Sequence, residues 1–247
     1  MNNILEIKNL YKNYQTIDEE VKVLDNINIK ANKGDFLGIV GPSGAGKSTL
    51  LSIISGLEKP SSGYIVKDDD ITFAYMLQTD TLMPYLTILD NCLLGLKINK
   101  KYSKEKELEV IKLLTKYGLK DYINKYPSDL SGGQKQRASL IRALCLSPDI
   151  LLLDEPFSAL DYQNRLNISN DIKDILKKEN KSMIIVTHDL SEAISLCSKV
   201  IVLSNKPSKI KSIYRIDLDQ DKDPINNRMS DEFMKYYKMI WRDLNDK

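Results

Sequence analysis

The chain has 247 residues, of which 42% are hydrophobic, so it can bury a core, and disordered or fibrous architectures are excluded. Its 36 Lys and Arg against 34 Asp and Glu leave a net charge of +2, so no bulk electrostatic field selects nucleic acid or an anionic membrane surface. One histidine, His188, and one tryptophan exclude a His-rich metal site and an aromatic platform of several tryptophans. No nucleic-acid partner is predicted.

The cysteines and the apolar runs predict a reducing, cytosolic compartment and a chain that does not cross a membrane. Cys92, Cys145 and Cys197 are odd in number and far apart and form no C-x-x-C pair, so neither a disulfide framework nor a zinc cluster is expected. The longest run without a charged residue, 36–46, is shorter than the roughly 18 apolar residues that span a bilayer. The sequence starts without a basic segment followed by an apolar one, so no secretory signal is expected.

The first part of the chain predicts a small β layer followed by a strand, a glycine loop and a helix. Short alternating stretches between residues 4 and 29 predict half-exposed antiparallel strands, and residues 32–34 predict a turn. The apolar run 36–40 predicts a buried strand. Residues 48–57, after a glycine-rich loop, have helical spacing.

The rest of the chain alternates helical segments with two further strands. A helix capped by Ser103 and ended by Gly118 is predicted from apolar residues at helical spacing, namely Leu108, Ile111, Leu114 and Tyr117. A second helix is expected over 132–145. The short apolar runs 150–153 and 183–186 predict buried parallel strands, each ending in a polar residue that can face a ligand.

A phosphate-binding loop is the strongest motif in the sequence. The pattern G-x-x-x-x-G-K-[ST] stands between a predicted strand and a predicted helix, and it comprises Gly41, Pro42, Ser43, Gly44, Ala45, Gly46, Lys47, Ser48 and Thr49. Glycines let backbone N–H groups turn towards phosphate oxygens, and the helix N-terminus adds positive potential. Lys47 supplies a charge to the terminal phosphates, and Ser48 offers its hydroxyl to Mg²⁺.

Two acidic residues follow the apolar run 150–153. Their position predicts carboxylates at the carboxyl end of a parallel strand, where open sheets bind ligands. Asp154 is expected to hold Mg²⁺ through water, and Glu155 is expected to polarise the attacking water.

A second anion-binding element is predicted at the start of the helix over 132–145. Ser131, Gly132, Gly133 and Gln134 place a hydroxyl and two glycines before a helix whose first N–H groups are free. A single chain with one phosphate loop binds one nucleotide, so it has no ligand for a second anion-binding element. Two chains meeting head to tail give it one, because each then offers it to the nucleotide of the other.

In this order and spacing, these segments resemble the nucleotide-binding subunits of ABC transporters. The resemblance covers nearly the whole chain and rests on 41–49, 130–134, 150–156, 158–161 and 187–189. It implies an α/β fold: a P-loop NTPase (RecA-like) core with an antiparallel β subdomain and an inserted α-helical subdomain.

The same resemblance implies one nucleotide-binding domain over 1–247. Its parts are the β subdomain with the phosphate loop (1–85), the helical subdomain with the signature motif (86–145), the rest of the ATPase core (146–215) and a tail helix (216–247). We expect the apolar face of the tail to pack onto its own domain; it comprises Phe233, Tyr237, Ile240, Trp241 and Leu244.

Further site residues follow from the resemblance alone. Gln78 is implied in the loop that touches both Mg²⁺ and the membrane partner, and Asp161 in a contact across the dimer. Tyr14 resembles the aromatic residue that stacks on adenine, with Tyr11, three residues away, as the alternative.

His188 is implied to bond the γ-phosphate and hold the hydrolytic water, a positioning role that phosphoryl transfer requires. It follows the predicted strand 183–186, so its side chain is expected at the same sheet edge as Asp154 and Glu155. Asp189 and Glu192 behind it predict a capping box for the next helix. The expected catalytic residues are Lys47, Gln78, Glu155 and His188.

Looser segments, 82–91, 153–161 and 205–210, resemble the ATPases of nitrate, sulfonate and taurine importers. This resemblance implies an ATPase that uses Mg²⁺ and ATP and sits peripherally on the cytoplasmic face of the membrane. Its implied partners are a second copy in an ATP-dependent head-to-tail dimer, permease subunits near Gln78 and 84–96, and indirectly an extracytoplasmic solute-binding protein.

The sequence departs from the usual pattern of these importers at Leu77, where Phe commonly precedes the glutamine, and at 197–200, which lacks the usual aspartate. Neither departure removes a catalytic group. Three alternatives stay open: the ATPase of a vitamin-precursor importer, that of an exporter with separate subunits, and a soluble ABC ATPase outside transport. The segment between Lys47 and Asp154 has no heptad array, unlike the soluble ABC ATPases that carry a coiled-coil insertion.

Overall fold

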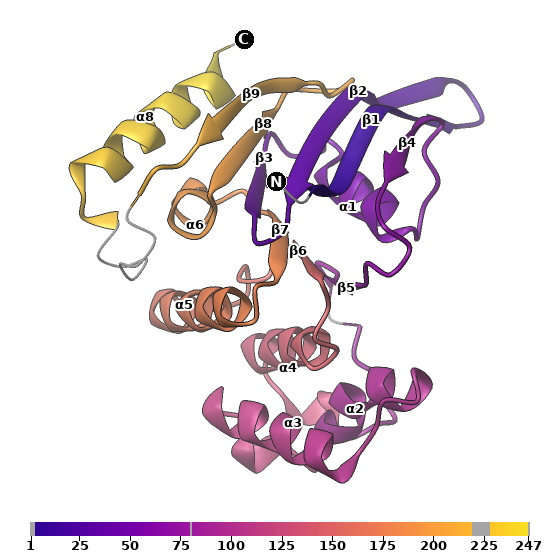
Figure 1. Ribbon diagram of the computed structural model, residues 1–247, viewed down its shortest axis with the longest axis vertical. Helices are drawn as coiled ribbons and strands as arrows, with labels where there is room; N and C mark the ends of the chain where they lie inside the picture. The colour runs from indigo at the N-terminus through magenta and orange to yellow at the C-terminus, as the bar shows by residue number, and fades with distance from the viewer. Residues whose placement is uncertain (1–2, 80, 219–227, 247) are drawn as a thin grey trace.

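The computed structural model describes residues 3–79, 81–218 and 228–246. Two β-sheets lie at one end of the molecule, and a group of helices lies at the other (Figure 1). Among the described helices, none is long and apolar enough to cross a bilayer.

The smaller sheet is antiparallel and has the strand order β2-β1-β4. Ile7 pairs with Ile29 on one side and with Ile65 on the other. Its strands are β1 (Asn3–Gln15), β2 (Glu20–Asn32) and β4 (Ser62–Val66). Since side chains alternate along a strand, the apolar residues of β1 and β2 face a core and the polar ones face solvent. The antiparallel strands predicted from the alternating pattern are confirmed.

The larger sheet has the order β5-β6-β7-β3-β8-β9. All its pairs are parallel except β8 with β9. Its strands are β3 (Phe36–Val40), β5 (Phe73–Met76), β6 (Ile150–Asp154), β7 (Ser182–Val186), β8 (Lys199–Leu203) and β9 (Ile210–Arg215). Every residue of β3, β6 and β7 is buried, which confirms the strands expected from the continuous apolar runs.

Alternate residues of the buried strands face two different cores. Leu37 and Ile39 join the core that includes the antiparallel sheet and α1 (Lys47–Ser55). Phe36 and Val40 join the other core, which includes α5 (Tyr162–Lys178) and α6 (Leu190–Leu196). The sheet is therefore covered on both faces, and ligands reach it at the carboxyl ends of its parallel strands.

The helices drawn at the lower end of Figure 1 are α2 (Ile88–Ile98), α3 (Lys104–Lys116) and α4 (Gly132–Leu144). Ser103 caps α3 by accepting from Lys106 N, as predicted, and α4 has the bounds expected to within one residue. Two single 3₁₀ turns, Lys120–Tyr122 and Pro127–Asp129, join α3 to α4. These helices lie within 86–145, and the division of the chain into subdomains stays a prediction.

The apolar residues from which α3 was predicted do not all lie on its buried face, because Leu108 is 50% exposed. Val110 and Leu114 are the buried residues of this helix, and Tyr117 is buried just after it. Leu108 and Tyr117 are nine residues apart. At about 100° per residue this separation amounts to two and a half turns, so their side chains lie on opposite sides of the helix.

The C-terminal helix α8 (Asp231–Asn245) packs beside α6 and β9 (Figure 1). Phe233 and Ile240 are buried, and Tyr237 and Leu244 pack against the same core, so the expected packing of the tail is confirmed for these residues. Trp241 is 54% exposed, because it lies at the edge of this face. Of the predicted tail, 219–227 and 247 lie outside the described residues.

Replacing Ile240 with Ala tests how strongly α8 is bound to the domain. Ile240 is fully buried, so we expect Ile240→Ala to lower the free energy of unfolding by about 2 to 4 kcal/mol, measured in urea. The neighbouring Met239 is 42% exposed, and Met239→Ala should change it by less than about 0.5 kcal/mol. Equal effects of the two variants would contradict this assignment.

Candidate functional site

The phosphate-loop motif lies between the end of β3 and the start of α1. Gly44 and Gly46 adopt left-handed backbone with φ of 76° and 81°. A Cβ at Gly46 would lie 2.5 Å from Cγ1 of Val23, so β2 approaches the loop too closely for a side chain there. Within the described residues, α1 begins with neither a side-chain cap nor an acid in its first turn. Its first N–H groups therefore stay available to an anion.

Lys47 lies buried against this loop, with only 8% of the residue exposed. Its Nζ donates to the backbone oxygens of Gly41 and Pro42, each at 2.9 Å. Burial lowers the pKa of Lys47, while the carboxylates of Glu155 and Asp154 oppose that shift. A phosphate entering the loop offers the ammonium group a stronger, charged partner than these two carbonyls.

A cavity of about 520 Å³ lies over the phosphate loop. Tyr14, Gln78, Glu155 and every residue of 43–49 line it. The remaining loop residues, Gly41 and Pro42, line a second cavity beside His188 and α8. The structure thus brings most of the predicted nucleotide-binding residues around one space, whose volume is typical of small-molecule sites.

Tyr14 lines this cavity, whereas Tyr11 lines a different one together with Asp25 and Lys209. The Tyr14 hydroxyl is hydrogen-bonded to Glu58 and Thr49, and burial, reinforced by Glu58, raises the pKa of Tyr14. Nζ of Lys12 lies 4.7 Å from the centre of the Tyr14 ring, at cation–π distance. Of the two tyrosines, only Tyr14 is placed beside the phosphate loop.

Asp154 ends β6 deep in the site and is 2% exposed. Its Oδ2 accepts from the hydroxyl of Tyr75 at 3.3 Å, and its carboxylate is also hydrogen-bonded to Ser48. Burial raises the pKa of Asp154, and the hydrogen bonds from Ser48 and Tyr75 oppose that shift. Its Oδ1 is buried with no hydrogen-bond partner in the part of the chain that the structure describes.

Three of the predicted catalytic residues meet at the carboxylate of Glu155. Gln78 Nε2 donates to Oε2 of Glu155 at 3.2 Å, and Nδ1 of His188 lies 3.3 Å from the same oxygen. Glu155 itself has a φ of 47°, an uncommon left-handed conformation for a side chain of this size. Its backbone N–H donates to Val186 O at 2.9 Å, which continues the pairing of β6 with β7 by one residue.

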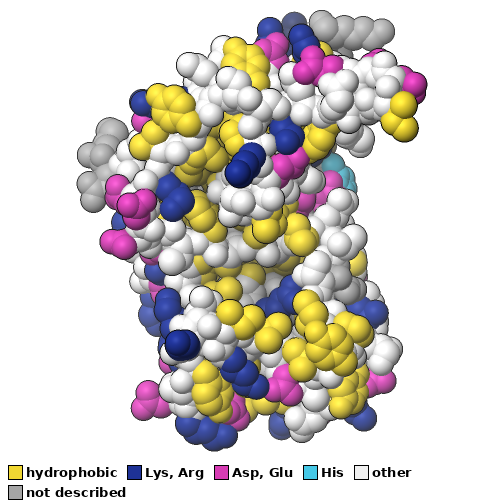
Figure 2. Space-filling model, turned by 90° about the vertical axis from the view of Figure 1, so that its right-hand side faces the viewer, with side chains coloured by type: hydrophobic (Ala, Val, Ile, Leu, Met, Phe, Trp, Pro, Cys, Tyr) yellow, Lys and Arg dark blue, Asp and Glu magenta, His cyan; other side chains and the backbone are white. Residues whose placement is uncertain are grey.

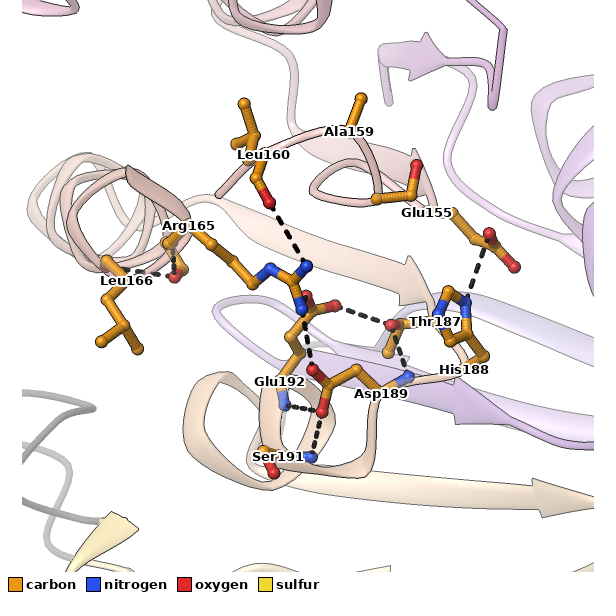
Figure 3. A network of polar contacts seen from close by, with 12 residues as sticks. Glu155, Ala159, Leu160, Arg165, Leu166, Thr187, His188, Asp189, Ser191 and Glu192 are labelled. Carbon is orange, nitrogen blue, oxygen red and sulfur yellow. Dashed lines mark hydrogen bonds and ion pairs between the residues drawn. The ribbon is translucent and has the colours of Figure 1, made fainter. Parts of the chain in front are cut away.

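The loop that carries His188 is held by its two neighbours (Figure 3). Asp189 caps α6 by accepting from Ser191 N and Glu192 N, as predicted. The second bond of the predicted capping box, from Asp189 N to the Glu192 carboxylate, is not formed, so this part of the prediction is wrong. The Glu192 carboxylate accepts from the Thr187 hydroxyl at 2.6 Å, and Asp189 N donates to Thr187 Oγ1 at 3.0 Å instead.

Arg165 of α5 extends this network, which the sequence did not reveal. Its Nη1 lies 3.1 Å from Asp189 Oδ2 and 3.6 Å from Glu192 Oε1, and its Nη2 donates to Leu160 O at 3.4 Å (Figure 3). Burial raises the pKa of Glu192, which is only 3% exposed, and the guanidinium opposes that shift. Arg165 therefore joins the segment before α5 to the loop that carries His188.

The structure places the remaining predicted residues away from the cavity of the same chain. Ser131 caps α4 in a full capping box with Gln134, and Gly133 packs beside the backbone of Ala159. Asp161 caps α5, and hydrogen bonds from Asn164 hold the pKa of Asp161 below its usual range. The cavity over the phosphate loop is lined by none of these described residues.

Gln136 is a second residue that the sequence analysis missed. It is 7% exposed, and its Nε2 donates to Glu155 O and to Ser158 Oγ, each at 3.3 Å. Its Oε1 accepts from Ala159 N at 3.0 Å. The sequence shows a glutamine two positions after the predicted anion element. Its burial and its hydrogen-bond partners follow from the tertiary structure alone.

Comparison with known proteins identifies the family. Residues 24–158 match the sequence pattern of the ABC transporter family. The chain belongs to the ABC transporter family. It is 40% identical to the ABC transporter ATP-binding protein YtlC of Bacillus subtilis over 98% of this chain and 95% of that protein. It is 36% identical to the aliphatic sulfonates import ATP-binding protein SsuB of Bacillus cereus over 96% of this chain and 94% of that protein.

Solved ABC cassettes have the same fold. The dimeric MJ0796 cassette in a post-hydrolysis state with ADP and Pi superposes with a TM-score of 0.77 at 32% identity, over 86% of this chain and 99% of that chain. The predicted P-loop NTPase core with an antiparallel sheet and a helical part is thereby confirmed. This ABC protein is an ATPase and the ATP-binding subunit of a transporter.

The buried Asp154 carboxylate gives a test by pH. Because its folded-state pKa is raised above the ordinary value of 3.8, its contribution favours folding at low pH and is lost as pH rises through the folded-state pKa. In nucleotide-free ABC ATPase with EDTA, we expect Asp154→Asn to raise the free energy of unfolding by about 1 to 2 kcal/mol at pH 7, and by less as the pH falls towards 4.

Asp149→Asn is the matched control for this measurement. Asp149 accepts from Thr72 N at 3.0 Å and pairs with Lys181 at 3.1 Å, so its replacement should destabilise the protein. If both variants are less stable than the wild type at pH 7, then the ionised Asp154 carboxylate does not destabilise the folded protein.

Proposed function

We propose that the chain energises import of a small solute, in the nitrate, sulfonate and taurine class, through separate membrane subunits. The observation that carries the ATPase half of this proposal is the convergence of Lys47, Gln78 and Glu155 on one cavity. The importer half is supported by the similarity to SsuB along nearly the whole chain.

Mg²⁺ is the proposed metal of this site, and Ser48, Asp154 and Gln78 are its proposed protein partners. The residues fit, because Asp154 presents a buried oxygen without a partner and lies against the Ser48 hydroxyl. Oxygen ligands of this kind suit Mg²⁺, which keeps several waters and binds through one or two carboxylates and substrate phosphates. When bound, it offsets the charge of the β- and γ-phosphates.

Hydrolysis is assigned to four residues of this chain. Lys47 binds the terminal phosphates, and Glu155 accepts the proton of the attacking water. Gln78 and His188 both contact the Glu155 carboxylate and so orient it, and His188 is also proposed to bond the γ-phosphate and hold the water. Tyr14, which lines the same cavity, is proposed to stack on adenine.

The signature segment, Ser131 to Gln134, is proposed to act on the nucleotide of a second copy in a head-to-tail dimer, with Asp161 in contact across the dimer. Two observations support this proposal. The segment lies outside the cavity of its own chain, and the MJ0796 cassette is dimeric in its solved structures. ATP held between two chains then closes the dimer, and hydrolysis reopens it.

The permease is proposed to contact the helical part of the chain near Gln78 and 84–96. Figure 2 shows hydrophobic side chains gathered over the lower, helical end of the molecule. Tyr85, Ile98 and Tyr126 are among the exposed apolar residues of this part of the chain. Docking there places the protein peripherally on the cytoplasmic face of the membrane, with the solute reaching the permease from an extracytoplasmic solute-binding protein.

Other solutes are the second candidate, because the relatives of this chain include proteins named for sulfate or thiosulfate import and for spermidine or putrescine import. Vitamin-precursor import and export through separate subunits belong to the same group of alternatives. The third alternative, a soluble ABC ATPase outside transport, is not supported, since the relatives are named as transporter subunits.

Glu155→Gln tests the catalytic assignment. Because only the proton-accepting group is lost, ATP affinity should stay within about threefold, while phosphate release should fall by at least about 100-fold. Glu109→Gln, which alters an exposed surface pair with Lys106, is the matched control and should release phosphate normally. Unchanged phosphate release by Glu155→Gln would exclude Glu155 as the base.

The same variant tests the composite site by sedimentation. Without nucleotide we expect a monomer, and with ATP and Mg²⁺ we expect Glu155→Gln protein to form a dimer. A monomer under the second condition would count against the role proposed for Ser131 to Gln134.

Growth of a deletion strain tests the solute class. With an aliphatic sulfonate, taurine or nitrate as the sole source of sulfur or nitrogen, the strain should stop growing on at least one of them and grow normally on sulfate or ammonium. The wild-type gene should restore growth, and the Glu155→Gln gene should not. Normal growth on all of these, with loss of polyamine or vitamin-precursor uptake, would contradict the proposed solute class and indicate one of the alternative solutes.

A further inference from the structure

The turn between β8 and β9 carries a lysine, Lys206, that no motif of the site includes. Lys206 lines the cavity over the phosphate loop together with Tyr14 and Glu155. In the described part of the chain it makes neither a hydrogen bond nor an ion pair. Its ammonium group is therefore available to a ligand bound in this cavity.

Both ends of this turn are anchored beside the phosphate loop. At one end, Leu203 of β8 lies so close to Gly41 that a Cβ there would come within 3.1 Å of the Leu203 Cβ. At the other end, Ser208 N donates to Val23 O and Asp25 N donates to Ser208 O, each at 2.9 Å. Val23 is the residue that packs against Gly46. The turn that carries Lys206 thus lies between two contacts to opposite ends of the same loop.

The charge balance of the cavity favours an additional cation. Lys47 is the cation of the loop, and Glu155 adds a negative charge to the lining. Asp154 lies close to both, so without Lys206 these three groups carry more negative than positive charge before a nucleotide enters. A triphosphate adds several more negative charges, of which a bound divalent cation offsets only part. Lys206, an exposed residue of the lining, supplies a second positive charge beside the buried Lys47.

We propose that Lys206 is a nucleotide-binding residue that pairs with the phosphate chain of ATP. The anchors on Gly41 and Val23 place the turn beside the phosphate loop, so phosphate oxygens are the expected partners and not the base. This inference rests on the assignment of the cavity to ATP. Because the side chain is exposed and flexible, it binds ground state and transition state alike, and its loss should weaken affinity without stopping the chemistry.

Lys209 provides a matched control in the same turn. It carries the same charge three residues further on, but its Nζ pairs with Asp25 at 3.1 Å and it does not line the cavity. Lys206→Gln and Lys209→Gln therefore remove the same charge from the same turn, and only the first removes it from the cavity.

The experiment is titration of ATP, ADP and adenosine into the wild-type full-length protein, Lys206→Gln, Lys206→Arg and Lys209→Gln, at low and at physiological salt with Mg²⁺. We expect Lys206→Gln to bind ATP about 3- to 10-fold more weakly at low salt, with a smaller loss at higher salt. Its KM for ATP should rise by a similar factor while kcat falls by less than about twofold. Lys206→Arg should retain most of the affinity, and Lys209→Gln should match the wild type.

Equal ATP affinity of Lys206→Gln and wild type would overturn the proposal. An equal loss of ATP affinity in Lys209→Gln would also overturn it, because the effect would then come from the general charge of the turn. An equal loss of adenosine affinity would overturn the phosphate assignment, because adenosine has no phosphate. Failure of the underlying assignment looks different. If the wild-type protein does not bind ATP, or if Lys47→Ala binds it normally, then the cavity itself is wrongly assigned.

Discussion

The position of β7 between β3 and β6 is the constraint on which the rest of the site depends. Val186, the last residue of β7, pairs with Ile39 of β3 on one side and with Asp154 of β6 on the other. Parallel pairing therefore ends the three strands at one level. The segments that follow them, which carry Lys47, Glu155 and His188, must then lie side by side, although Lys47 is more than a hundred residues from the other two in sequence.

The site concentrates features that are unfavourable for folding, and the surrounding network compensates for them. Glu155 has an uncommon backbone conformation, and buried Asp154 keeps an unpartnered oxygen. Gln136 binds the Glu155 carbonyl and the backbone after it, and Arg165 binds the carbonyl of Leu160. The segment between Glu155 and α5 is therefore held from α4 at its start and from α5 at its end. Both helices therefore contact the segment that carries Glu155.

The near-neutral composition now has a structural meaning. Lys47, Asp154 and Glu155 place charge close together around the phosphate loop, while the helical end of the molecule exposes apolar side chains among its charged ones (Figure 2). The two ends are joined by α4, whose first turn carries Ser131 and Gln134 and whose buried side carries Gln136. One helix therefore connects the phosphate-loop site to the surface that we propose for permease docking.

The sequence by itself determined the phosphate loop, the buried strands, the caps of α3 and α6 and the family, because these depend on local patterns of glycine, apolar and capping residues. It did not determine which face of α3 is buried, because a stripe of every third residue drifts around a helix. Only the tertiary structure placed Tyr14, already favoured over Tyr11 by the resemblance, on the cavity over the phosphate loop, and showed Glu192 bonded to Thr187 in place of the cap. Only it placed Gln136, Arg165 and Lys206 beside the site. Apart from the Thr187–Glu192 hydrogen bond, these outcomes depend on contacts between segments distant in sequence, and strand order, which no local pattern encodes, decides which segments meet.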